Sequence, residues 1–422
     1  MISPNQYGFR QQRSTTDGIF ILKNLIEKTN TPFVATFIDL KAAYDWVPRD
    51  SLIKVFEFRT GATKIAKMLA EGFRDTKAQI TGSKEQFSTT CGLKQGALES
   101  PVLFNIYFDF CIAIAKEKIN QEISPGKVSL KFNIKTECLG PRELRTHGDS
   151  HGEVEVDEEE YADDLVGINT SIEEARQSLV AMDETFKKFG LTISFGKTET
   201  MLFGFPEEDA ARTSLFEVSG EAIKNVRSFT YLGHSISNLD VNDIDTSSLD
   251  HRISLAKGKF QELKKVLCDR DIQLPIRANF LQTFVRSRLL YAVQCWDLRE
   301  AEIKRLEACW HGLLRRMVNN GFRKKEPQVE DSYALFYNNE DLVRITGTVP
   351  LRRFIHEQQI RYTAHLCRLP NTDMRKQILF SQGRRYSRSI WKKFGRLLNL
   401  SEIQLRKDMM DRARVKDLLD LL

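Results

Sequence analysis

The sequence lacks several features that would place it in other protein classes. No apolar run is long enough to span a bilayer, so no membrane partner is expected. The segment Met1–Gln6 has no apolar core, so no secretory leader is expected either. The seven cysteines are scattered and form no CxxC pair, which argues against a disulfide framework or a zinc site and favours a nuclear or cytoplasmic, reducing location. Internal repeats, low-complexity tracts and coiled-coil heptads are also missing.

Charge is distributed unevenly along the chain. Residues 1–250 contain 28 Lys and Arg against 38 Asp and Glu, whereas residues 251–422 contain 35 against 19. The first part therefore carries a balance of −10 and the second a balance of +16. An acidic part joined to a basic part suits metal chemistry beside a polyanion. A basic, solvated surface without a partner is the alternative interpretation.

Hydrophobic periodicity predicts an α+β region to about residue 236 and an all-helical basic region after it. A polar linker at 238–248 is the expected boundary, and the acidic stretch 153–160 is expected to be an exposed insertion. The predicted helices are 15–28, one starting at Pro48, 63–74, 101–119 and 172–189. The predicted strands are 33–39, 191–195, 199–203 and 228–232, with a hairpin at 78–90 and a further strand near 127–135.

The most informative segment is Tyr161-Ala162-Asp163-Asp164, in which two adjacent carboxylates precede an apolar run. Adjacent carboxylates repel each other, so a fold that holds them together usually supplies a cation. The alternative is an ordinary Asp-Asp turn at the end of a hairpin.

A third carboxylate, Asp39, closes the apolar strand 33–39 and can reach the turn if the two strands are neighbours. Three carboxylates and a backbone carbonyl, such as that of Leu40, would form an all-oxygen site. Such a donor set favours Mg²⁺, with Mn²⁺ also possible, over Zn²⁺. Two such ions suit phosphoryl transfer.

Six segments, in order, resemble the motifs of the reverse transcriptase of a LINE-type non-LTR retrotransposon. They are Gln6-Tyr7-Gly8-Phe9-Arg10 with Arg13-Ser14-Thr15, Phe37 to Pro48 (motif A), Gly92 to Asn105 (motif B), Tyr161 to Asp164 (motif C), Gly190 to Ile193 with Lys197-Thr198 (motif D), and Phe229 to Gly233 (motif E). The resemblance covers about residues 5–320 and is specific because the motifs are ordered and plausibly spaced.

The resemblance implies a right-hand polymerase fold. Its expected parts are partial fingers and palm at 1–236, a helical thumb at 237–325 and a basic helical C-terminal region at 326–422. It also implies an RNA-directed DNA polymerase that joins a deoxynucleoside triphosphate (dNTP) to a DNA primer on an RNA template.

The resemblance assigns roles to individual residues. Asp39 and Asp163 would bind two catalytic metal ions, and Asp164 would complete the site. The nucleotide-binding residues would be Tyr44 as the gate against a 2′-hydroxyl, Gln95, Gly96 and Lys197. Tyr231, Leu232 and Gly233 would form the primer grip. Without the motifs, Tyr44 reads as a core aromatic residue, Lys197 as a solvated lysine, and the last three as a plain hairpin turn.

The sequence departs from the family pattern in three ways. It begins at the Gln6 block and shows no endonuclease domain, which implies an N-terminally truncated element. Glu99 also stands in motif B where a small-Pro-Leu-Ser pattern is usual. A catalytically inactive remnant that only binds nucleic acid is therefore the alternative function, and a maturase-like splicing cofactor is a third class.

Overall fold

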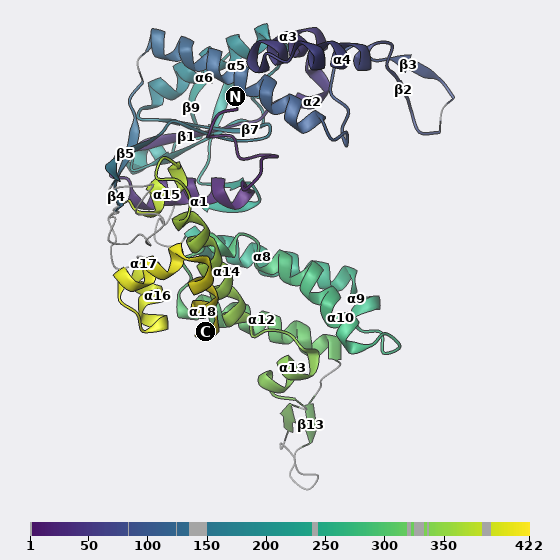
Figure 1. Cartoon of the computed structure of the whole chain (residues 1–422), viewed down its shortest axis with the longest axis vertical. Coiled ribbons are helices and arrows are strands. Elements are labelled where there is room, and N and C mark those ends of the chain that lie inside the picture. Colours follow the sequence, from purple (N-terminus) through teal and green to yellow (C-terminus); the bar gives the residue numbers. More distant parts are fainter. Residues whose placement is uncertain are drawn as a thin grey trace. The chain divides into compact units, whose positions relative to one another are not determined.

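The computed structural model has two compact units (Figure 1). The sheet unit comprises Met1–Lys131 and Glu153–Leu232, and the helical unit comprises Phe132–Gly152, Gly233–Ser381 and Arg385–Leu422. The structure describes residues 2–82, 84–123, 125–134, 150–238, 244–318, 322–324, 333–335, 337–381 and 390–422.

The sheet unit is built on a six-stranded sheet with the strand order β6-β7-β1-β8-β10-β9. Its strands are β1 (Phe33–Ile38), β6 (Glu158–Tyr161), β7 (Asp164–Asn169), β8 (Glu199–Phe203), β9 (Ser214–Val218) and β10 (Glu221–Asn225). All neighbours are antiparallel except β8 and β10, which run parallel. The strand β1 therefore lies inside the sheet, between β7 and β8.

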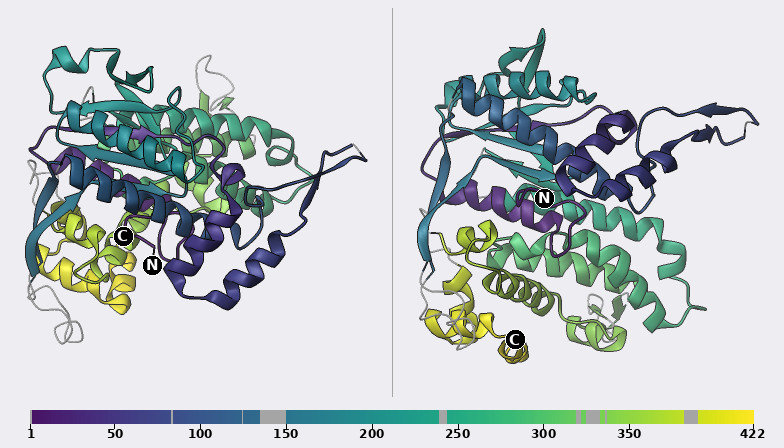
Figure 2. Two further views of the ribbon diagram at one scale, coloured as in Figure 1. Left: turned by 90° about the horizontal axis from the view of Figure 1, so that it is seen from above. Right: turned by 45° about the horizontal axis from the view of Figure 1, so that its top comes forward.

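The strand β1 is buried along its whole length, as its nearly unbroken apolar sequence predicts. Successive side chains point to opposite faces. Val34 and Ile38 join the core beneath the helices α5 (Ser100–Glu122) and α6 (Ile172–Lys188). On the other face the ring of Phe37 stacks on Phe229, with 4.0 Å between centroids. Figures 1 and 2 show α5 and α6 together on one face of the sheet and α1 (Thr15–Lys28) on the other.

The other elements of the sheet unit lie around this core. They are α2 (Ala43–Trp46), α3 (Arg49–Thr60), α4 (Thr63–Phe73), β2 (Lys77–Gln79), β3 (Gln86–Ser88) and α7 (Glu207–Ala210). The hairpin of β2 and β3 projects beyond α4 in every view of Figures 1 and 2. Two further strand pairs are β4 (Val128–Ile134) with β5 (Ser150–Val156), and β11 (Ser228–Tyr231) with β12 (His234–Ser237).

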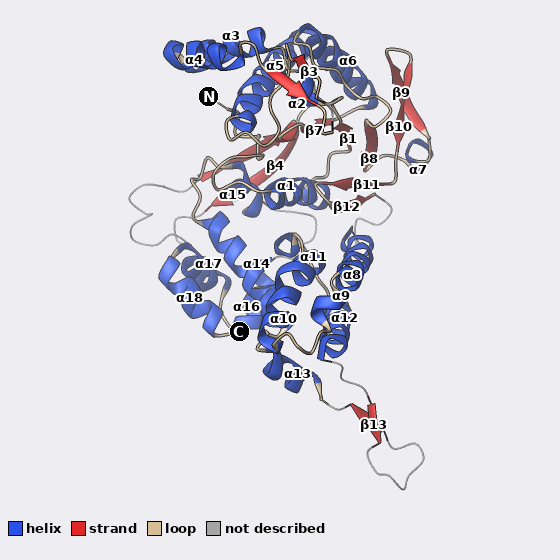
Figure 3. Cartoon of the chain, turned by 90° about the vertical axis from the view of Figure 1, so that its right-hand side faces the viewer, coloured by secondary structure: helices blue, strands red, loops and turns tan. Residues whose placement is uncertain are grey.

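Figure 3 shows the helices of the helical unit in blue. They pack around a second core that includes Phe260 and the fully buried Trp310. Its longer helices are α8 (Ile244–Glu262), α12 (Glu300–Val318) and α14 (Leu351–Cys367). The remaining elements are α9 (Lys264–Leu267), α10 (Leu274–Phe280), the π-helix η3 (Leu281–Arg286), α11 (Ser287–Leu289), the 3₁₀ turn η4 (Val293–Cys295), β13 (Phe322–Lys324), β14 (Tyr333–Leu335), α13 (Asn339–Thr346), α15 (Met374–Leu379), α16 (Ile390–Leu398), α17 (Glu402–Met410) and α18 (Arg412–Asp420).

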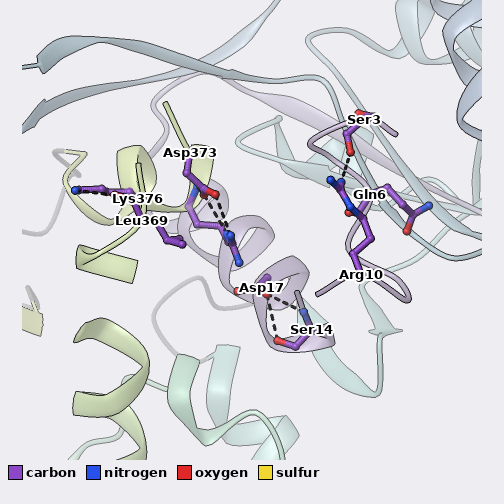
Figure 4. Close-up of polar contacts among 9 residues, drawn as sticks. Ser3, Gln6, Arg10, Ser14, Asp17, Leu369, Asp373 and Lys376 are labelled. Atoms are coloured by element: carbon purple, nitrogen blue, oxygen red, sulfur yellow. Dashed lines mark hydrogen bonds and ion pairs between the residues drawn. The ribbon is translucent and has the colours of Figure 1, made fainter. Parts of the chain in front are cut away.

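Most predicted elements of the sheet unit are confirmed, including the helix at 15–28 and the strand at 33–38. The helix at 15–28 is preceded by Ser14, which forms a capping box with Asp17 (Figure 4). The predicted strand at 191–195 is wrong, since this segment makes only an isolated bridge between Ile193 and Leu40. Residues 239–243 of the predicted linker at 238–248 lie outside the described residues, and the prediction is wrong for 244–248, which begin the helix α8 (Ile244–Glu262).

Some strands, among them β9 and β10, were not predicted because their short sequences show no clear alternation of apolar and polar residues. Within the parts that the structure describes, no helix combines the length and the apolar character that crossing a bilayer requires.

Candidate active site

The candidate site is built by strand register. The strands β6 and β7 form a hairpin in which Tyr161 pairs with Asp164, so Ala162 and Asp163 form the turn. On the other side of β7, Leu165 pairs with Ile38. Asp39 follows Ile38 directly, and in an antiparallel register it stands level with Asp164. The three carboxylates therefore meet at one end of the two neighbouring strands.

The carboxylates perturb one another electrostatically. Burial is the largest of the effects that together raise the pKa of Asp164 to about 6, and the negative charges of Asp163 and Asp39 contribute the rest. Asp164 is exposed as a residue, yet protein atoms surround its carboxyl closely enough for lost hydration to be the largest cause. Burial and the charge of Asp39 also raise the pKa of Asp163. A cation bound here would reverse these shifts by favouring the ionised forms.

One positive side chain lies at this cluster. Lys197 Nζ is 3.4 Å from Asp39 Oδ2, although most of the lysine side chain is exposed. That oxygen is buried and makes no hydrogen bond. The segment that carries Lys197 is fixed beside the end of β1, because Ser194 N donates to the carbonyl of Asp39 at 2.7 Å and Lys41 N donates to that of Thr192 at 2.9 Å.

The donor chemistry fits a hard divalent ion. Three carboxylates, one of them with a buried oxygen that lacks a hydrogen bond, form an all-oxygen set beside the backbone of Leu40. Across the described ranges, no three His, Cys, Asp or Glu side chains are already arranged to hold one ion. Shared coordination would therefore require rotation of the aspartate side chains, while the backbone register already supplies their proximity.

Tyr44 lies beside the carboxylates. Its ring stacks on Phe104 of α5, with 4.4 Å between centroids. Burial, and then the negative charge of Asp163, raises the pKa of Tyr44 to about 12. The phenol is therefore neutral at physiological pH, and its ring packs on the helix α5 near enough to Asp163 to be affected by that charge.

The loop that carries Gln95 and Gly96 is tied to the Tyr44 segment through its first residues. Leu93 N donates to the carbonyl of Tyr44 at 2.8 Å, and Gly92 N donates to that of Val47 at 2.9 Å. Gly96 has a φ of +87° in open surroundings, so its backbone conformation favours glycine there. Gln95 is exposed. The described contacts therefore place the loop, rather than the Gln95 side chain itself, next to the Tyr44 segment.

The segment Tyr231-Leu232-Gly233 forms the turn between β11 and β12. Leu232 and Gly233 both have positive φ, at 46° and 75°. Tyr231 is only 3% exposed and its hydroxyl donates to Glu159 Oε2 at 3.4 Å, so its side chain belongs to the core. The exposed part of this turn is the backbone that follows Tyr231.

The expectation that 153–160 is exposed is wrong for Glu158, Glu159 and Glu160, which are 3%, 1% and 0% exposed in β6. Lys116 Nζ lies 2.9 Å from Glu158 Oε1. Burial raises the pKa of all three carboxyls. Sequence reasoning missed them because glutamate is rarely buried. The only available signal was their position, directly before a hairpin that enters the core.

Comparisons with known proteins give one curated relative, the putative COX1/OXI3 intron 2 protein of Saccharomyces cerevisiae. It is 28% identical over 123 residues, which make up 29% of this chain and 14% of the relative. The chain thus spans about one seventh of the length of that protein.

Solved structures of telomerase from Candida tropicalis are also similar. The complex with the TWJ fragment of telomeric RNA is 13% identical, covers 89% of this chain and 52% of its own, and has a TM-score of 0.37. The apo form is 12% identical, covers 90% and 58%, and also has a TM-score of 0.37.

A family model described as reverse transcriptase (RNA-dependent DNA polymerase) matches residues 1–236, more than half of the chain. This range holds the three carboxylates, Tyr44 and the motif B loop, and its α+β architecture with a central, largely antiparallel sheet is that of the reverse transcriptase fold. The chain belongs to the reverse transcriptase family.

Proposed function

We propose that the chain is an RNA-directed DNA polymerase that extends a DNA primer on an RNA template. In this reaction the 3′-hydroxyl oxygen of the primer forms a bond to the α-phosphorus of a dNTP, the bond to pyrophosphate breaks, and the hydroxyl proton is released. The observation that carries the proposal is the register that brings Asp39, Asp163 and Asp164 together beside the Tyr44 ring.

In this proposal Asp39, Asp163, Asp164 and the carbonyl of Leu40 hold two divalent ions, Mg²⁺ or Mn²⁺. When bound, such ions neutralise triphosphate charge and stabilise the attacking and leaving oxygens. The protein contributes fixed positions, because the carboxylates sit at the ends of paired strands rather than on separate loops.

The nucleotide pocket is proposed to contain Tyr44, Gln95, Gly96 and Lys197. The Tyr44 ring, supported by Phe104, would lie under the sugar and exclude a 2′-hydroxyl. Lys197, which already pairs with Asp39, would turn toward the triphosphate when cations occupy the carboxylates.

The primer end is proposed to contact the turn Tyr231-Leu232-Gly233 through its backbone, since the Tyr231 side chain is buried. The division of the chain into fingers and palm at 1–236, thumb at 237–325 and basic C-terminal region at 326–422 is part of the same proposal. The six ordered motifs support a LINE-type non-LTR retrotransposon as the source.

Primer extension on an RNA template tests this function. The chain should add dNTPs with Mg²⁺, and chelation of the ion should abolish the product. Asp163→Asn should lower the rate at least ~10³-fold because the loss of one carboxylate removes transition-state electrostatics. Product that survives this substitution would disprove the assigned role of Asp163.

Sugar selection tests the Tyr44 assignment separately. Tyr44→Val removes the ring but keeps an apolar side chain at this half-buried position, so ribonucleotide incorporation should rise at least ~10-fold relative to deoxynucleotide incorporation. Phe104→Leu is the matched control, because it removes the stacking partner while keeping the gate. An unchanged ratio in Tyr44→Val would refute the gate.

The second candidate is a protein that binds nucleic acid without synthesis. The +16 balance of residues 251–422 favours it. A salt titration of RNA binding separates the two: steep salt dependence without primer extension supports this candidate, and extension excludes it.

A further inference from the structure

The segment Asn5–Gly8 lies along the outer edge of β6. Tyr7 N donates to the carbonyl of Glu160 at 2.8 Å, and Glu160 N donates to that of Asn5 at 3.0 Å. The two segments form a parallel bridge at Gln6 and Glu160. This pairing extends the sheet beyond β6 and brings the Gln6 side chain beside the hairpin turn.

The side chain amide of Gln6 is fully buried and uses its whole hydrogen-bonding capacity. Its Oε1 accepts from Ala162 N and from Gly8 N, both at 2.8 Å. Its Nε2 donates to the carbonyl of Ala162 at 3.3 Å and to Glu160 Oε2 at 3.2 Å. The amide therefore binds both backbone groups of Ala162, as a neighbouring strand would.

Ala162 is a position that needs such support. Its φ is 57°, in the left-handed region, which costs a residue with a β-carbon about 1 kcal/mol. It is buried, and the next residue is Asp163. Any relaxation of Ala162 would therefore move the Asp163 carboxylate.

Two further contacts fix the segment that carries Gln6. Asn105 Nδ2 of α5 donates to the carbonyl of Gly8 at 2.8 Å. Arg10 Nη1 donates to the carbonyl of Gln6 at 3.1 Å and also bonds Ser3 (Figure 4). A β-carbon on Gly8 would lie 2.3 Å from Ala162 N, so the two backbones are in direct contact. Gln6 is thus held from both of its flanks.

We propose that Gln6 is a positioning residue that fixes the Ala162-Asp163 turn, and through it the Asp163 carboxylate. The inference rests on the proposed polymerase function for its kinetic consequence, but its structural content is independent of that function. Gln6 acts through the backbone of Ala162 and touches no substrate.

Hydrogen exchange measured by mass spectrometry tests the structural content on the full chain. In Gln6→Leu the Ala162 amide loses its acceptor, so peptides that cover the 160–165 turn should exchange at least ~10-fold faster. Gln359→Leu is the matched control, because Gln359 is 1% exposed and donates to two backbone carbonyls of the helical unit. It should leave the exchange of the turn unchanged.

A pair of charge variants guards against general misfolding. Gln6→Glu removes the amide donor to Glu160 and to the carbonyl of Ala162, whereas the double variant Gln6→Glu/Glu160→Gln restores one amide donor between the side chains at positions 6 and 160. The single variant should loosen the turn and the double variant should recover most of its protection. Equal exchange in wild type and Gln6→Leu, or a double variant no better than Gln6→Glu, overturns the proposal.

Primer extension gives the kinetic consequence. Gln6→Leu should lower kcat at least ~10-fold with less than ~3-fold change in KM for the template–primer, because the change lies at the reacting centre. A KM effect alone overturns the positioning role. If the wild-type chain makes no product, the polymerase function fails, while the exchange experiment still decides the role of Gln6.

Discussion

The sheet unit and the helical unit hold their functional groups in opposite ways. In the sheet unit the important charges are carboxylates that lie inside or beside the sheet, and they are placed by strand pairing between residues far apart in sequence, such as Ile38 and Leu165. In the helical unit the excess charge is positive, and many of its ion pairs are local, such as that between Arg344 and Asp341. A disturbance of the sheet unit should therefore change chemistry, whereas a disturbance of the helical unit should change affinity.

The largest effect expected from this contrast is at Asp164, where substitution should lower activity but raise stability. Its pKa of about 6 means that ionisation at neutral pH opposes folding. Asp164→Asn should lower the extension rate at least ~10²-fold, yet raise the free energy of unfolding without metal by about 1 kcal/mol, after allowance for solvent screening. Extension rates and urea midpoints at pH 7 check this.

Asp417→Asn, an exposed change in α18, is the control for Asp164→Asn. It should change neither quantity appreciably. An Asp164→Asn variant that is less stable than wild type would show that the carboxylates are not mutually repelling, and would remove the contrast between the units.

The next largest effect is a difference in stability between alanine substitutions of one glycine in each unit. Gly92 has a φ of +85°, and a β-carbon there would lie 2.6 Å from the carbonyl oxygen of Asp45. Gly92→Ala should therefore destabilise by about 2–4 kcal/mol and slow extension by moving the motif B loop. Gly312 of α12 has open space around it, so Gly312→Ala should stabilise by about 0.5–1 kcal/mol through helix propensity. Thermal unfolding of both variants measures the difference, and destabilisation by both would contradict it.

Sequence reasoning reached this site only in part. The apolar strand that ends at Asp39 and the hairpin that carries Asp163 were predictable, because burial and turn chemistry are local signals. Their pairing in one sheet was an inference that the register confirms. The role of Gln6 was not predictable, since it depends on a contact 156 residues away in the chain with Ala162. The functional assignments of Tyr44, Gln95 and Lys197 stay predictions.

The burial of Glu158, Glu159 and Glu160 was missed for a related reason. Solvation favours exposed glutamates, and tertiary partners such as Lys116, Gln6 and Tyr231 make their burial tolerable. Composition describes a segment but does not reveal partners that come from other elements.

Buried groups in the two units should also make stability depend on pH in opposite directions. In the sheet unit burial raises the pKa of Glu160 from 4.5 to about 8, so the folded state holds a proton that the unfolded state has lost, and stability falls as pH rises through this window. In the helical unit burial lowers the pKa of His356 from 6.5 to about 4, so stability falls as pH drops through that window.

Substitution separates the two contributions. Relative to wild type, the free energy of unfolding of Glu160→Gln should rise by roughly 2 kcal/mol between pH ~5 and pH ~8. That of His356→Gln should rise by a similar amount as pH falls from ~7 to ~5. Urea midpoints across this range check both. His251→Gln, an exposed histidine, should run parallel to wild type. If the stabilities of Glu160→Gln and His356→Gln, each relative to wild type, changed in the same direction with pH, the comparison between the two units would be contradicted.

The smallest effect concerns a single cation of the helical unit. Arg288 of α11 is exposed, on a helix whose preceding turns expose Phe280 and Phe284. Arg288→Ala should weaken binding of an RNA–DNA duplex about threefold and reduce the salt slope by about 1, without changing kcat. Arg305→Ala is the control, because Arg305 already pairs with Asp250 and has less charge to offer a phosphate. If Arg288→Ala instead lowered kcat at saturating duplex, the helical unit would contribute to chemistry as well as affinity, and the division of labour between the two units would have to be abandoned.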